Sequence, residues 1–103
     1  MKESLLHNLQ KLVSRHEELS GLLSDPDVIG NQNKFRDFSR EYSKLEPVAK
    51  LFGQYEKAVD DVAAAREMIE DTDPEIRALG EDEVETAEEQ VEEIELSLRK
   101  HLT

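Results

Sequence analysis

Apolar and aromatic residues recur every three or four positions between about residue 33 and residue 70. Residues at that spacing lie on one face of an α-helix, so the pattern predicts a single long central helix over 33–70. The stripe consists of Phe35, Phe38, Tyr42, Leu45, Val48, Phe52, Tyr55, Val59, Val62, Arg66 and Ile69. A helix of about 38 residues would be on the order of 57 Å long, so the flanking segments must pack along it.

The spacing of the stripe slips once, at Leu45 and Val48, and Pro47 lies inside the slip. Proline lacks the backbone N–H, and its ring clashes with the preceding turn of a helix. We therefore expect a kink or a short break in the central helix near Pro47, with the stripe resuming beyond it.

Leucines also step by three and four near the amino terminus, which predicts a first helix over residues 2–23 with a coiled-coil-like seam. The seam is formed by Leu5, Leu9, Leu12, His16, Leu19 and Leu23. Asp25 before Pro26 stops this helix and starts one further turn. Asn31 or Asn33 then caps the central helix. Because the connection is short, the first helix and the central helix should be antiparallel.

A third helix is predicted over residues 74–101. Its apolar stripe consists of Ile76, Leu79, Val84, Ala87, Val91, Ile94 and Leu98. Thr72 and Glu75 match a capping box at its start, and we expect Gly80 to weaken the helix and to mark a bend. Together the patterns predict an all-α fold, with three long antiparallel helices forming a coiled-coil-like bundle in a single domain over residues 1–103.

The net charge of −12 lies entirely in the second half of the chain. Residues 1–57 hold nine Lys/Arg and nine Asp/Glu, whereas residues 58–103 hold four Lys/Arg and sixteen Asp/Glu. The acidic half should repel bare nucleic acid, so we expect it to make no direct contact with RNA. Its charge is either a solvated face that keeps the protein soluble or an electrostatic guide toward a basic protein partner.

The sequence contains no cysteine, which excludes disulfides and thiol chemistry and fits a reducing compartment. No apolar run approaches the ~20 residues that a membrane span requires. The amino terminus lacks the apolar core of a signal peptide. We therefore expect a cytoplasmic protein that makes no membrane contact.

No arrangement of residues in the sequence points to catalysis. The four glycines are isolated, so they form no phosphate-binding loop. His7, His16 and His101 are too far apart in sequence for metal-ligand spacing, and acid–base chemistry would need a buried carboxyl group. We expect no catalytic residue, no cofactor and no metal, and we interpret His16 as a seam histidine satisfied by a neighbour rather than as a ligand or a pH sensor.

Arg36, Arg40 and Lys44 step by four along the central helix, away from the aromatic stripe. One interpretation is a solvated face in which Asp37 and Glu41 pair with these cations. The other is a contact face for a phosphate backbone or an acidic partner. These three residues are the candidate contact residues of the sequence.

Two segments carry a resemblance to a known family. They are Lys34–Leu45, which contains Ser-Arg-Glu-Tyr after a phenylalanine, and an opening that contains His16-Glu17-Glu18-Leu19 and Leu22-Leu23-Ser24-Asp25-Pro26. With the acidic helical hairpin and the Thr-Asp-Pro-Glu at its tip, they resemble the N-terminal domain of bacterial class-I peptide chain release factor 1. The resemblance covers essentially the whole chain.

The resemblance implies an accessory domain of a translation termination factor that orients the factor on the ribosome. It implies contacts with the stalk base of the large ribosomal subunit and with the release-factor GTPase. The Gly-Gly-Gln and Pro-x-Thr tripeptides that carry out release and codon reading in that family are absent from this sequence. The alternative is a free-standing acidic coiled-coil adaptor or a chaperone for basic proteins. We expect the native chain to continue past Thr103, and exposed apolar area to favour a dimer in a crystal.

Overall fold

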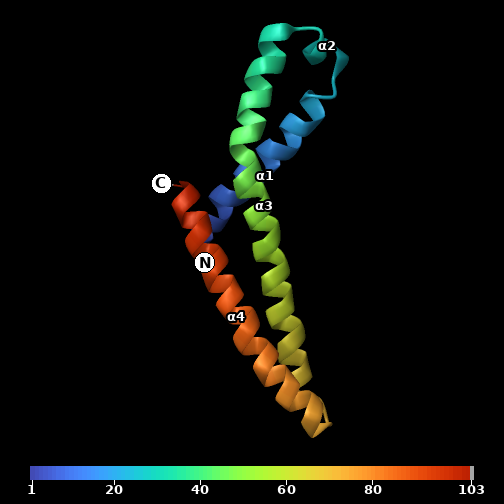
Figure 1. Cartoon of the computed structure of the whole chain (residues 1–103), viewed down its shortest axis with the longest axis vertical. Coiled ribbons are helices and arrows are strands. Elements are labelled where there is room, and N and C mark those ends of the chain that lie inside the picture. Colours follow the sequence, from blue (N-terminus) through green and yellow to red (C-terminus); the bar gives the residue numbers. More distant parts are fainter. Residues whose placement is uncertain (103) are drawn as a thin grey trace. The chain divides into compact units, whose positions relative to one another are not determined.

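The computed structural model describes residues 1–102, and these residues contain helices and no strand (Figure 1). The long helices are α1 (Glu3–Leu22), α3 (Gln32–Ile69) and α4 (Pro74–Leu102), and the short helix α2 covers Pro26–Ile29. Helices make up 89 % of the structure, which confirms the predicted all-α fold. Each end of a long helix lies within one residue of the end that the sequence predicts.

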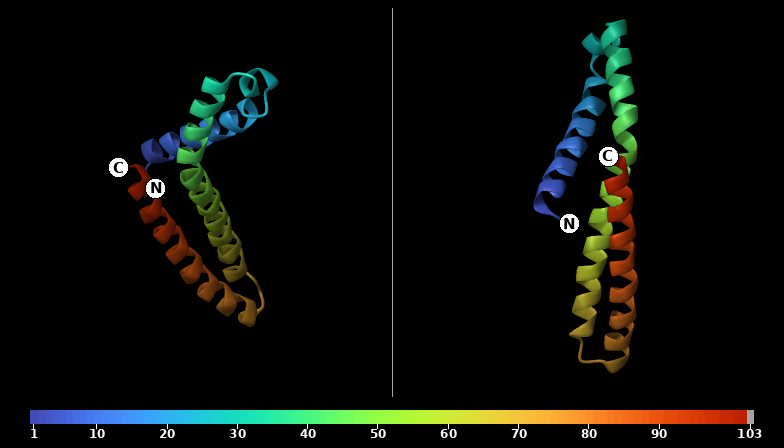
Figure 2. Two further views of the ribbon diagram at one scale, coloured as in Figure 1. Left: turned by 45° about the horizontal axis from the view of Figure 1, so that its top comes forward. Right: turned by 90° about the vertical axis from the view of Figure 1, so that its left-hand side faces the viewer.

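The chain divides into two compact units, and α3 contributes to both. The first unit covers Met1–Lys50 and the second begins at Leu51. In the first unit α1 and the amino-terminal part of α3 form an antiparallel pair, with α2 in the connection between them (Figures 1 and 2). In the second unit the carboxy-terminal part of α3 and α4 form an antiparallel hairpin.

Side-chain caps fix the connection between α1 and α3. The carboxylate of Asp25 accepts a hydrogen bond of 2.9 Å from the backbone N–H of Asp27 at the start of α2. The side-chain oxygen of Asn31 accepts a bond of 3.2 Å from the backbone N–H of Lys34 in the first turn of α3. The predicted single turn after Pro26 is thus confirmed, and of the two candidate caps the structure uses Asn31.

The cap of α4 differs from the predicted one by one position. Because α4 begins at Pro74, the capping residue is Asp73, whose carboxylate accepts a hydrogen bond of 2.9 Å from the backbone N–H of Glu75. Proline at the first helical position needs no backbone partner there, which favours this register. The predicted capping box beginning at Thr72 is wrong, and the carbonyl of Thr72 instead accepts a bond of 3.1 Å from Arg77.

The central helix α3 runs unbroken through Pro47. Proline removes the bond to the carbonyl of Ser43, a loss that typically costs about 3 kcal/mol within a helix. Ser43 is exposed, so water can reach this part of the backbone. The predicted short break is therefore wrong, while the predicted kink stays a prediction.

The side chains that α3 buries in the second unit are smaller than those that the sequence pattern predicts. Val59 and Arg66, both assigned to the packed stripe, are exposed, with 40 % of Val59 accessible to solvent. The neighbouring Ala58 and Ala65 are buried instead. Hydrophobicity alone favours valine over alanine as a seam residue, but closely spaced helices bury the smaller side chain.

Gly80 explains this close spacing. A Cβ atom added at Gly80 would lie 2.8 Å from the Cβ of Met68, and 3.0 Å from both the carbonyl oxygen of Ala65 and the backbone nitrogen of Ile69. The backbone of α4 therefore packs directly against α3 at this point. Helix α4 continues through Gly80, so the glycine is a packing position within an unbroken helix.

The predicted stripe of α4 is also wrong near its start. Ile76 and Leu79 are exposed, with 52 % of Leu79 accessible to solvent. The next residue along α4, Gly80, is buried. Further along, Ala87 and Leu98 are buried as predicted.

No helix within residues 1–102 is both long enough and apolar enough to cross a membrane.

Candidate functional site

The three candidate contact residues lie on α3 within the first unit, and all are exposed. Arg36 forms an ion pair with the adjacent Asp37, with 3.1 Å between its Nη2 and the carboxylate Oδ1. Neither Arg40 nor Lys44 has an ion pair among residues 1–102. The cations that remain available on this face are therefore Arg40 and Lys44.

Glu41 lies between these two cations in sequence but pairs with α1 instead. Its Oε1 and Oε2 accept hydrogen bonds of 2.7 and 2.8 Å from Nε and Nη2 of Arg15, which is the two-pronged geometry that a guanidinium offers a carboxylate. The bonds from Arg15 lower the pKa of Glu41, and they raise the pKa of Arg15 further above its ordinary value. Glu41 therefore stays ionised without neutralising Arg40 or Lys44.

The same arginine links the ion pair to the aromatic stripe. Arg15 also donates to Glu18 one turn along α1, and its guanidinium carbon lies 5.9 Å from the centre of the Phe38 ring. A cation at that distance over an aromatic face is attracted by the ring. The contacts of Arg15 with Glu41 and Phe38 thus hold α1 against α3.

His16 stacks on Tyr42 next to this cluster. The two ring centres are 4.4 Å apart, with an angle of 16° between the planes. The prediction that a neighbour satisfies His16 is wrong, because the contact with Tyr42 is a ring stack and gives the imidazole no hydrogen bond. Its Nε2 atom is buried and has no hydrogen-bond partner among residues 1–102. The stack packs α1 on α3, so we interpret His16 as a packing residue and not as a ligand.

The acidic surface of the second unit contains few ion pairs to offset its charge. Arg66 of α3 pairs with Glu88 of α4 at 2.9 Å, and Lys57 pairs with Asp61 on α3 at 3.4 Å.

Tyr55 is partly buried beside Phe52, with 6.1 Å between the centres of the two rings. Its pKa is raised, mainly by burial and to a smaller extent by the negative charge of Glu95.

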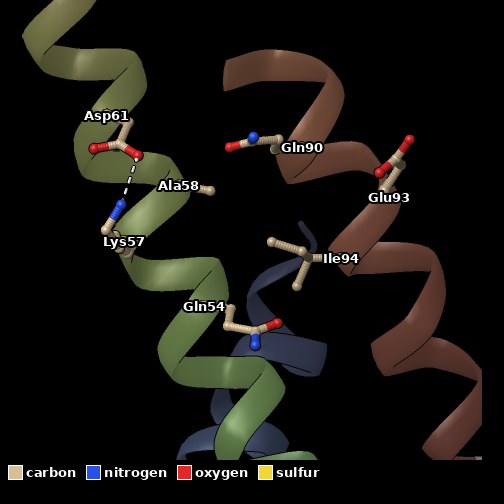
Figure 3. Close-up of a pocket in the computed structure, with 7 residues that line it drawn as sticks. All are labelled: Gln54, Lys57, Ala58, Asp61, Gln90, Glu93 and Ile94. Carbon is tan, nitrogen blue, oxygen red and sulfur yellow. Dashed lines mark hydrogen bonds and ion pairs between the residues drawn. The ribbon is translucent and has the colours of Figure 1, made fainter. Parts of the chain in front are cut away.

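A groove lined mainly by polar and charged residues lies on one face of the α3–α4 hairpin (Figure 3). Its lining residues are Gln54, Lys57, Ala58, Asp61, Gln90, Glu93 and Ile94. The two carboxyl groups are exposed, and that of Asp61 is paired with Lys57, whereas general acid–base catalysis relies on a shielded carboxyl group. The groove can offer hydrogen bonds and charge, and it resembles a contact surface more than a reaction site.

A second, apolar groove on the hairpin was missed by the sequence analysis. We call it the valine groove; it encloses 530 Å³ and is lined by Val59, Val62, Ala63, Arg66, Glu88 and Val91. The sequence assigned Val59, Val62 and Arg66 to the packed stripe. The signal that could have separated them is the parallel series of small residues at Ala58 and Ala65, which marks the true contact line between the helices.

The described residues contain no group of three or more His, Asp or Glu side chains that could hold a metal ion. The carboxylates are spread along helices instead of converging on one point. The features that remain are surfaces: a cationic face on the first unit, and an acidic, grooved hairpin on the second.

A family model described as the PCRF domain matches residues 12–103 of the chain. No solved structure matches the chain. The matched range includes the cationic face, the Arg15–Glu41 pair and the whole of the acidic hairpin.

Proposed function

Since the chain belongs to the PCRF domain family, the helical domain of class-I peptide chain release factors, we propose that it is an accessory domain in translation termination. The family match over residues 12–103 is the observation that carries this proposal. The domain would act in the cytoplasm as the N-terminal part of a longer release factor. Its role would be to orient that factor through contacts with the ribosome and with proteins.

The absence of two motifs from the sequence supports a role in contact and not in chemistry. Release factors use Gly-Gly-Gln for hydrolysis and Pro-x-Thr for codon reading, and this sequence contains neither tripeptide. The PCRF domain is a helical domain and does not carry the catalytic motif. The domain on its own would therefore be inactive in peptidyl-tRNA hydrolysis.

The charge distribution suggests that the two units meet different partners. The exposed Arg40 and Lys44, joined by the paired Arg36, form a cationic face suited to an anionic surface of the ribosome. The acidic hairpin is suited to a basic protein surface. By resemblance to the family, the proposed partners are the stalk base of the large ribosomal subunit and the release-factor GTPase.

A pull-down from purified ribosomal and termination-factor proteins tests the proposal, with a peptidyl-tRNA hydrolysis assay in parallel. The proposal predicts capture of protein partners that weakens as salt is raised, because exposed charges are screened within about 8–10 Å at physiological ionic strength. It also predicts no hydrolysis. Release activity by the chain alone, or no capture of any of these proteins at low salt, would overturn it.

A further inference from the structure

The valine groove exposes apolar side chains where the surrounding surface is almost wholly charged. Val59 is 40 % accessible to solvent, and Val62, Ala63 and Val91 line the same groove from both helices of the hairpin. The ion pair between Arg66 and Glu88 lies at its edge, with 2.9 Å between the charged atoms. An apolar floor with a charged rim is the composition of a protein-contact site.

The dimensions of the groove suit a helix. Along α3 its lining residues run from Val59 to Arg66, which is about two turns or roughly 10 Å of helix. A groove between two helices accepts an amphipathic helix that inserts apolar side chains at positions i, i+3 or i+4, and i+7. Two or three such side chains would cover Val59, Val62 and Val91.

The charge of the rim selects the kind of helix. Exposed carboxylates lie one turn before or after the lining residues on the same helices, at Glu56, Glu67, Glu70, Glu85 and Glu92. The groove contains one cation, Arg66, which Glu88 already pairs. A partner helix would therefore gain from Lys or Arg beside its apolar ridge, and an acidic helix would be repelled.

The same charge argues against a second copy of this chain as the occupant. Residues 58–103 hold sixteen Asp/Glu against four Lys/Arg, so two hairpins brought together would repel each other. A basic protein helix meets both requirements of the groove, the apolar floor and the acidic rim.

We infer that the valine groove is a docking site for a basic amphipathic helix of a protein partner. The inference rests on the proposed contact function and specifies which surface of the acidic hairpin makes a contact and what chemistry the partner presents.

The test uses a fluorescently labelled helical peptide of about 15 residues, with leucines at i, i+4 and i+7 and flanking lysines, titrated with the chain. One comparison peptide carries glutamate in place of lysine, and another contains the same residues as the basic peptide in an order that forms no apolar ridge. The docking site should bind the basic amphipathic peptide at least about tenfold more tightly than either comparison peptide, which corresponds to about 1.4 kcal/mol.

Matched variants locate the binding surface. Val59→Ser should weaken binding about fivefold or more, because it removes apolar contact area from the groove. Leu96→Ser is the control, since Leu96 is an apolar residue of α4 outside the groove and is more exposed than Val59, at 55 % against 40 %, and it should change binding less than about twofold. Glu92→Gln should reduce the salt dependence of binding, whereas Glu46→Gln on the first unit should not.

Three results would overturn the inference. They are equal binding of the scrambled basic peptide, equal weakening by Val59→Ser and Leu96→Ser, or concentration-dependent dimerisation of the chain that Val59→Ser abolishes. If any of these results is found while the chain still captures ribosomal or termination-factor proteins, the groove is rejected and the proposed contact function remains intact.

Discussion

The guanidinium of Arg15 holds the carboxylate of Glu41 through two hydrogen bonds, of 2.7 Å from Nε to Oε1 and 2.8 Å from Nη2 to Oε2. This pair joins α1 to α3 in the first unit, and it removes from the cationic face the carboxylate that could have neutralised Arg40 or Lys44. One contact thus serves both the packing of two helices and the charge of a surface.

The Arg15–Glu41 pair should make the free energy of unfolding fall as the pH is lowered into the acidic range. Arg15 lowers the pKa of Glu41 below its ordinary value of 4.5, so the folded state holds the ionised carboxylate more strongly than the unfolded state does. The stabilisation is fully present above that ordinary value and is lost as the pH falls through the lower pKa of the folded state.

The measurement is the melting temperature of the chain and of Glu41→Gln between neutral and acidic pH. The wild-type chain should melt higher near pH 7, and the difference should shrink below pH 4.5, the ordinary pKa of Glu41. Comparing the two proteins cancels the shared effect of protonating the acidic hairpin. A difference that is constant across the whole pH range would contradict the assigned role of the pair.

The close approach of α4 to α3 predicts opposite effects for two similar substitutions in the second unit. Gly53→Ala should stabilise the chain by roughly 0.5–1 kcal/mol, because alanine favours a helix and a Cβ at Gly53 meets no atom within 4 Å. Gly80→Ala should destabilise it by about 1–3 kcal/mol, because its Cβ would clash with Met68 and with the α3 backbone. Urea unfolding of both variants checks this, and a stabilising Gly80→Ala would show that the helices are further apart.

The corrected stripe of α3 predicts which of its apolar residues supports the fold. Phe52 is 5 % exposed, so Phe52→Ala should cost about 3–5 kcal/mol. Val59→Ala should cost less than about 0.5 kcal/mol, because Val59 lies in the open valine groove. Calorimetric melting of the two variants measures this difference. A similar loss of stability in both would show that Val59 is part of the core.

Much of the fold could be predicted from the sequence because periodicity and capping are local. The step of three and four residues fixes the helices, and Asp25 before Pro26 fixes the first connection. The register of packing was harder, since Ala58 and Val59 are neighbours and either could face α4. That choice depends on the distance between the helices, which Gly80 sets from another part of the chain.

The site could be predicted in part for the same reason. The step of four identifies Arg36, Arg40 and Lys44 as one face of a helix, and the structure places all three on the surface. Pattern alone could not show that Glu41 pairs with Arg15, because the two residues are 26 positions apart and meet only when the helices fold together. The valine groove was hidden because exposed valines follow the same helical spacing as buried ones.

The cationic face gives a prediction for ribosome binding. Lys44→Glu should weaken co-sedimentation of the chain with ribosomes at low salt, because it reverses a charge that has no ion pair among residues 1–102. Lys50→Glu is the matched control, since Lys50 is an exposed lysine of α3 that is off the four-residue series. Equal loss from both variants would indicate a general charge effect and would reject the assigned face.

Co-sedimentation of the unmodified chain with purified ribosomes, at low and at high salt, tests the central claim of a contact domain most directly. A domain that contacts the ribosome through exposed charges should pellet with ribosomes at low salt and be released at high salt. A chain that stays in the supernatant at both salt concentrations would contradict it.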